Sequence, residues 1–240
     1  MIYVLCLAIF FATFIGGAIP LVRTWKQIRL HQFIGFGAGI LLGTCFLFMV
    51  PEATESLGGL VGIGILIGFL CFYFLEKFMM VHACTEVGCE LHDMGLPIFI
   101  GFSLHSLVDG VALGSSFLVP SLMPIVFFAL LAHHGPTSFA FTSILKVAGY
   151  TWRKMFAALC LFSVMIPLSA LTTHFSLVRV SNEGIGWVIA FSAGIFLHIA
   201  TCDILPEIHT FHKKNIRNLW AFTLGLLIMT SLYFFFDHAH

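Results

Sequence analysis

Residues 59–75 of the chain read GLVGIGILIGFLCFYFL, a run that contains no charged side chain. The run is apolar on every side, so it lacks the alternation of apolar and polar residues seen in strands of a membrane β-barrel. A helix needs about 20 consecutive apolar residues to cross a bilayer. The stretch therefore predicts a membrane-spanning helix, and the rest of the chain repeats its pattern.

The composition of the whole chain agrees with this prediction. Of its 240 residues, 60% are hydrophobic and only 9% are charged, and the mean hydropathy is +1.05. Soluble domains contain about a quarter charged residues, so that class is excluded. The 11 basic and 11 acidic residues balance and form no basic run, which excludes nucleic acid as a partner. We expect an all-α, polytopic membrane protein.

Hydrophobic runs separated by polar or Pro/Gly clusters predict eight spans, with approximate bounds 2–22, 33–50, 59–75, 97–118, 122–145, 155–174, 185–205 and 218–236. If all eight cross the bilayer, ten of the 11 Lys and Arg residues lie on one side and only Arg179 lies on the other. The positive-inside rule then places both termini outside. The small size of the chain favours a bacterial cytoplasmic (inner) membrane.

The second and seventh predicted spans share an internal pattern. Each contains a Gly-Ile pair followed at the same offset by a Pro-Glu pair. These are Gly39-Ile40 with Pro51-Glu52 and Gly194-Ile195 with Pro206-Glu207. Such an echo is typical of transporters built from structural repeats, and chance similarity between apolar segments is the alternative. It predicts one domain, 1–240, with repeat halves at about 1–77 and 152–236 and central helices at about 97–145.

The two central segments carry ionisable side chains at membrane depth. An ionisable residue there costs about 2.5–3.5 kcal/mol on insertion scales and is by default a functional-site hypothesis. His105 and Asp109 are four residues apart, so they lie on one helix face one turn apart. This spacing suits two ligands of one metal ion. The alternative is that His105 and Asp109 only pair with each other and bind no metal.

The following segment contains HHGPT at residues 133–137. Pro136 has no N–H, so one carbonyl of the preceding turn loses its helical partner beside the two histidines. His133 and Thr137 share a helix face, whereas His134 points about 100° away. Imidazole and carboxylate ligands suit Zn²⁺ or Fe²⁺ better than Mg²⁺ or Ca²⁺. The histidines and the His–Asp pair together predict a transition-metal site.

Two runs in these segments carry a family resemblance. Residues 105–114 read HSLVDGVALG and residues 133–138 read HHGPTS. They resemble the H-N-x-x-D-G-x-A-x-G and H-E/N-x-P-H/E-E/G motifs of ZIP (Zrt/Irt-like) metal transporters. The Pro-Glu ends of the second and seventh spans and the run 75–77, LEK, also fit in order. The resemblance implies eight helices, external termini and a 3+2+3 inverted-repeat bundle.

By this resemblance, the family's midplane metal ligands map to His105, Ser106, Asp109, His133, His134 and Thr137. The chain departs from the family at Thr137, where a carboxylate or His is usual, and at His134, where a carboxylate is frequent. We therefore expect one principal site built by His105, Asp109 and one or both adjacent histidines. Ser106 and Thr137 are expected to be weak oxygen donors.

Further candidates lie outside this site. His198, Asp203 and Glu207 belong to the seventh segment and are candidate metal ligands towards the cytoplasmic exit. Glu52 is a candidate entrance group. The loop 76–96, which contains several His and Cys residues, is a candidate for metal capture, and ordinary solvated polarity is the alternative.

The leading hypothesis is a transporter, not an enzyme, that imports Zn²⁺ into the cytoplasm by alternating access. Fe²⁺, Mn²⁺ and Cd²⁺ are further candidate ions. The expected partners are the divalent ion and the lipid bilayer, and a homodimer is left open. One alternative is an intramembrane zinc-dependent hydrolase, in which the metal activates water. Another is a non-transporting metal-binding relative, suggested by the carboxylates missing from the second motif.

Overall fold

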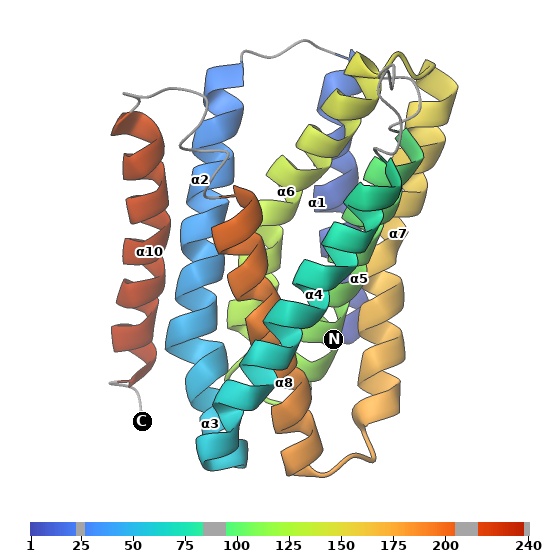
Figure 1. Cartoon of the computed structure of the whole chain (residues 1–240). Coiled ribbons are helices and arrows are strands. Elements are labelled where there is room, and N and C mark those ends of the chain that lie inside the picture. Colours follow the sequence, from blue (N-terminus) through green and yellow to red (C-terminus); the bar gives the residue numbers. More distant parts are fainter. Residues whose placement is uncertain (23–26, 84–94, 205–215, 238–240) are drawn as a thin grey trace.

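The computed structural model describes residues 1–22, 27–83, 95–204 and 216–237, which form a bundle of long helices without strands (Figure 1). In chain order the helices are α1 (Ile2–Val22), α2 (Gln27–Thr44), α3 (Val50–Leu57), α4 (Val61–Ala83), α5 (Gly95–Ser116), α6 (Met123–Val147), α7 (Trp152–Leu177), α8 (Asn182–His198) and α10 (Ile216–Asp237). Two π-helical turns, η1 (Cys45–Met49) and η4 (Ile199–Ile204), continue α2 and α8. The 3-10 turn η2 (Gly58–Leu60) precedes α4. The all-α prediction is confirmed.

Each hydrophobic segment expected from the sequence overlaps these helices. Within the described residues, six stretches are long and apolar enough to cross a membrane: Ile2–Val22, Gly35–Phe78, Met123–Lys146, Trp152–Leu177, Asn182–Cys202 and Arg217–Phe235. Helix α5, which carries a His, a Ser and an Asp at its centre, is not one of the six. The polytopic membrane class is confirmed, and the count of eight crossings stays a prediction.

A glycine turn divides the 44-residue stretch Gly35–Phe78 into two helical arms. Gly58 has a φ of +55°, a backbone conformation that side chains with a Cβ rarely adopt. The helix through α2, η1 and α3 ends there, and α4 begins at Val61 and runs back along the bundle (Figure 1). The reversal brings α4 back beside α8.

Helix α5 is fixed against α7 by small residues. A Cβ placed on Gly110 would lie 2.6 Å from Ser169 Cβ and 2.7 Å from the carbonyl oxygen of Ile166, so only glycine permits this approach. Ser169 Oγ also donates a hydrogen bond to the carbonyl of Leu107 at 2.5 Å. Small residues and interhelical hydrogen bonds stabilise helix pairs in membranes, where apolar burial alone gives no preference. These contacts set the rotation of α5 and hence the direction of its polar face.

Candidate metal centre

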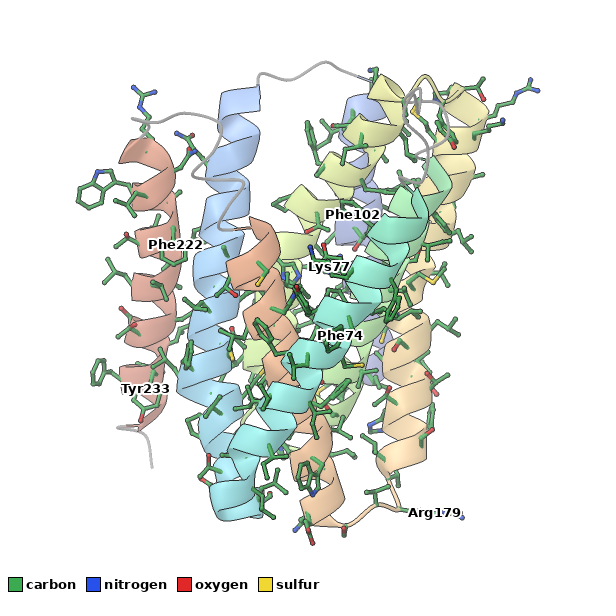
Figure 2. The ribbon with its side chains drawn as sticks, in the orientation of Figure 1. Phe74, Lys77, Phe102, Arg179, Phe222 and Tyr233 are labelled. Carbon is green, nitrogen blue, oxygen red and sulfur yellow. The ribbon has the colours of Figure 1, made fainter. Side chains whose placement is uncertain are left out.

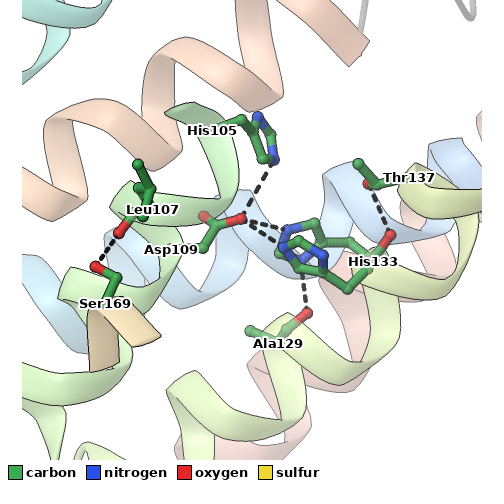
Figure 3. Close-up of polar contacts among 8 residues, drawn as sticks. His105, Leu107, Asp109, Ala129, His133, Thr137 and Ser169 are labelled. Atoms are coloured by element: carbon green, nitrogen blue, oxygen red, sulfur yellow. Dashed lines mark hydrogen bonds and ion pairs between the residues drawn. The ribbon is translucent and has the colours of Figure 1, made fainter. Parts of the chain in front are cut away.

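Four titratable side chains converge at the centre of the bundle, two from α5 and two from α6 (Figure 3). They are His105, Asp109, His133 and His134, and one ligand atom from each lies within 4.8 Å of all the others. The His105 side chain is 13% exposed, His133 is 2% exposed, and the other two are fully buried. The structure therefore brings together the four residues on which the sequence prediction rests.

One oxygen of Asp109 is the meeting point of the cluster. Its Oδ2 lies 3.3 Å from Nε2 of His105, 3.5 Å from Nε2 of His133 and 2.7 Å from Nε2 of His134. The shortest of these contacts is a hydrogen bond between His134 and the carboxylate. Because an unpaired carboxylate is costly to bury, the hydrogen bond from His134 helps to stabilise Asp109 at this depth.

His133 is oriented by its own helix. Its Nδ1 donates a hydrogen bond of 2.8 Å to the carbonyl of Ala129, one turn earlier in α6. A proton on Nδ1 leaves the lone pair of Nε2 free and directed at the cluster, an arrangement typical of metal-binding histidines. Gly37 of α2 makes room for this side chain, since a Cβ there would lie 2.9 Å from His133 Cβ.

The two hydroxyl residues of the predicted site differ in their contacts. Ser106 is fully buried, and its Oγ has no hydrogen-bond partner among the described residues. The hydroxyl of Thr137 instead donates to the carbonyl of His133 at 2.9 Å (Figure 3). Ser and Thr side chains in helices often bond back to the preceding turn in this way. Ser106 is therefore the freer oxygen donor of the two.

None of the lower-ranked candidates that the structure describes joins the cluster. His198, at the end of α8, is fully buried, and its Nε2 lies 3.7 Å from Oε2 of Glu76 on α4. The structure does not describe the side chain of Asp203, nor Glu207, nor residues 84–94 of the candidate capture loop. Glu52 accepts a hydrogen bond from Ser121 at 3.2 Å, away from the central histidines.

Glu76 is the polar residue whose place the sequence reasoning missed. It entered that reasoning only as the middle of the LEK run at residues 75–77. Its spacing on α4 gave no hint of a partner, because the partner belongs to α8 and is distant in sequence. His198 could have indicated such a residue, because a histidine at membrane depth usually has a polar neighbour.

A buried set of three imidazoles and one carboxylate is chemically suited to a borderline transition-metal ion. Zn²⁺ is most often four-coordinate, with His nitrogens at about 2.0–2.1 Å and carboxylate oxygens at about 2.0–2.2 Å. The ligand atoms are close enough that modest side-chain movements would bring them to those distances. Fold and site together define a helical membrane protein with a candidate metal centre inside the bilayer.

Comparison with known proteins gives the family. The model of the ZIP zinc transporter family matches residues 1–86 and 81–233, and the chain belongs to this family. It is 25% identical to zinc transporter ZIP9-B of Xenopus laevis over 92% of this chain and 89% of the relative. It is 28% identical to zinc transporter ZIP13 of Pongo abelii, over 87% of this chain and 68% of the relative. A ZIP9 of Macaca fascicularis is 35% identical over 45% of this chain and 50% of the relative.

Membership in this family decides between the transporter and the intramembrane hydrolase. It supports a membrane transporter of divalent metal ions and not an enzyme, so the intramembrane hydrolase is no longer favoured. The low identities agree with a divergent member. The expectation of a bacterial membrane has no support here, because the relatives just named are animal proteins.

Proposed function

We propose that the chain transports Zn²⁺ through a single site formed by His105, Asp109, His133 and His134. The observation that carries this proposal is the convergence of four ligand atoms within 4.8 Å in a buried position. The family and the relatives' names support zinc as the ion. Fe²⁺, Mn²⁺ and Cd²⁺ are further candidates, because imidazole and carboxylate ligands also accept these ions.

The charge of the cluster favours one ion over two. Asp109 is its single acid, so one divalent ion leaves a net charge of about +1 with neutral imidazoles, and two would leave about +3. Like charges at close range repel strongly where the dielectric constant is low. Ser106 is the proposed auxiliary oxygen donor. All of these groups come from one chain, so the site needs no second copy, and a homodimer stays a prediction.

We place these ligands in an eight-helix bundle of 3+2+3 inverted-repeat organisation. Two observations support it. The π-helical turns η1 and η4 occupy corresponding positions in the two segments that share the Gly-Ile and Pro-Glu pattern. Gly39 packs against the backbone of α10 at Phe222, and its counterpart Gly194 packs against the backbone of α4 at Ile65. An inverted repeat would exchange these two helix pairs.

Sidedness follows from the charges at the ends of the bundle. Figure 2 shows Arg179 at one end of the molecule and Lys77 well away from it, nearer the middle of the bundle. Lys77 belongs with the group of ten basic residues, and Arg179 is the exception. The positive-inside rule assigns the end with ten to the cytoplasm. On this basis both termini lie outside, and import into the cytoplasm is the proposed direction.

Alternating access requires one group of helices to move against another. Close glycine contacts join α5 to α7 at Gly110 and α1 to α6 at Gly16. In a second group of helices, close glycine contacts join α2 to α10 at Gly39 and α8 to α4 at Gly194. All four proposed ligands belong to the first group. A shift of this group against the second would expose the bound ion to each side in turn.

Zinc flux into proteoliposomes tests the proposal. The double variant His105→Ala with Asp109→Ala should abolish flux above the level of empty liposomes, while the protein inserts and remains monodisperse. Glu183→Gln, which changes an exposed acid at the start of α8, is the matched control and should keep wild-type flux. Unchanged zinc flux in the double variant would refute the assignment. Parallel measurements with Fe²⁺, Mn²⁺ and Cd²⁺ define selectivity.

The non-transporting relative stays a second candidate, because one carboxylate supports the site where the family motif usually supplies more. A non-transporting relative can be recognised when zinc binding is measured alongside flux. Calorimetric zinc binding to the purified wild-type protein, together with no flux of any of the four ions, would favour it. Saturable flux that depends on the four ligands would favour transport.

A further inference from the structure

His198 lies in an aromatic pocket beside the metal centre. Three rings from one face of α4 surround its imidazole, with ring centroids 5.1 Å away for Phe69, 5.4 Å for Phe72 and 6.0 Å for Tyr73. Glu76, on the same face one turn further along, approaches its Nε2 at 3.7 Å. Neither ring nitrogen of His198 makes a hydrogen bond within the described ranges of the chain. A buried polar group without a hydrogen-bond partner lowers the stability of the fold by about 1–3 kcal/mol.

The ring of Phe72 contacts imidazoles on two sides. Its centroid is 6.3 Å from that of His105 in the metal centre and 5.4 Å from that of His198, with interplanar angles of 68° and 66°. Phe72 is 5% exposed, so it is enclosed by protein and not by lipid. One apolar ring therefore bridges the metal centre and the pair formed by His198 and Glu76.

Beyond this ring, the pair of His198 and Glu76 includes one partly exposed side chain. The Glu76 side chain is 32% exposed, and it lies next to Lys77, towards the end of α4 that we assigned to the cytoplasm. A metal ion that leaves the centre by this route meets a polar pair only after it has passed the ring. Apolar constrictions of this kind close ion pathways, because a charged ion in them has neither water nor ligands.

We propose that Phe72 is a gating residue that closes the path between the metal centre and the pocket of His198 and Glu76. The proposal rests on the proposed function and adds the step that limits release of the ion. Rotation or displacement of the ring opens the path, and the unbonded imidazole of His198 is the first polar group that the ion meets. The ring does not bind the ion in the resting site.

This role predicts a kinetic signature that altered packing would not produce. A gate changes the rates of ion entry and release together, so the dissociation constant stays the same. Loss of packing around His105 would change the geometry of the ligands and weaken binding. Shortening and enlarging the side chain at position 72 should therefore move the release rate in opposite directions at constant affinity.

The experiment uses the full chain with Phe72→Leu and Phe72→Trp. Zinc affinity is measured by calorimetry, release by stopped flow into an excess of chelator, and flux in proteoliposomes. We expect release and flux about tenfold faster for Phe72→Leu and about tenfold slower for Phe72→Trp, both with a Kd within about twofold of wild type. Phe74→Leu is the control, since Phe74 is on the same helix and 52% exposed (Figure 2).

The gate would be overturned if both Phe72 variants released zinc at the same rate as the Phe74 control. It would also be overturned if the Kd changed in proportion to the release rate. Failure of the gate is distinct from failure of the transport proposal. If the wild type binds and transports zinc and the Phe72 variants do not differ from it, only the gate is wrong. If the wild type neither binds nor transports zinc, the proposed function is wrong and the gate with it.

Discussion

Asp109→Asn removes the one negative charge of the metal centre with little change in shape. The side chain is fully buried, and its Oδ2 accepts a hydrogen bond from His134 at 2.7 Å. An amide oxygen can accept the same bond, and the amide N–H₂ can donate to a neighbouring imidazole nitrogen. The ion-free protein is therefore expected to fold normally. What it loses is the anion that faces the arriving Zn²⁺.

The size of the loss follows from the contacts of this carboxylate. Truncation of one partner of a buried, hydrogen-bonded charge pair costs about 2–5 kcal/mol. With about 1.4 kcal/mol for each factor of ten, the zinc Kd should rise by about 30- to 4000-fold. The upper part of this range is expected, because no other acid lies in the cluster to compensate.

Calorimetric titration of purified protein with ZnCl₂ measures the affinity, and proteoliposome flux measures transport. The folding control is the thermal midpoint, which should stay within a few degrees of wild type. The reasoning is refuted if the Asp109→Asn protein binds zinc with a Kd within threefold of wild type. A large drop in the thermal midpoint would instead assign the carboxylate a structural role.

Three further predictions concern the surroundings of the centre. Ser106→Ala should weaken zinc binding more than Thr137→Ala in calorimetry, because the Thr137 hydroxyl is already bonded to a backbone carbonyl; the reverse order would contradict the assigned donors. Gly110→Ala should destabilise the protein by about 1–3 kcal/mol, because the new Cβ would lie 2.6 Å from Ser169 Cβ. Gly101→Ala on the same helix meets open space and should leave the thermal midpoint equal or higher. Zinc affinity should fall as the pH is lowered through the acid range, because protons compete for the imidazole nitrogens that bind the metal, and an affinity that acid does not change would argue against a histidine-based site.

Continuous hydrophobic runs were sufficient to predict the long helices of this protein. Each expected segment is bounded by Pro, Gly or charged residues, and a membrane helix must satisfy its own backbone hydrogen bonds, so little else could form. The internal turn at Gly58 was also predictable, since segments 33–50 and 59–75 are separated by a polar, glycine-containing run. The π-helical turns η1 and η4 were not, because no local residue pattern distinguishes them from an α-helix.

The metal centre was predictable only in part. The spacing of His105 and Asp109 fixed which residues share a face of α5, but not which way that face points. Its direction depends on the close approach of Gly110 to α7, a contact between residues distant in sequence. Thr137 shows the limit of face arguments, since it shares a helix face with His133 yet its hydroxyl bonds back to the helix. Glu76 and Phe72 were missed as neighbours of the site for the same reason.

The contacts of Asp109 bear on how such a site could serve transport. A carrier that alternates access passes through conformations in which its site is loaded and others in which it is empty. An isolated buried carboxylate would raise the free energy of the empty conformations. In this chain Asp109 Oδ2 accepts a hydrogen bond from His134 at 2.7 Å. Its other oxygen, Oδ1, has no such partner within the described residues. The hydrogen bond offsets part of the cost of the buried carboxylate, while the unsatisfied oxygen leaves free energy to be gained when an ion binds. Because His134 is also a proposed zinc ligand, replacing it with a residue that cannot donate to Asp109 should penalise both the empty and the loaded state.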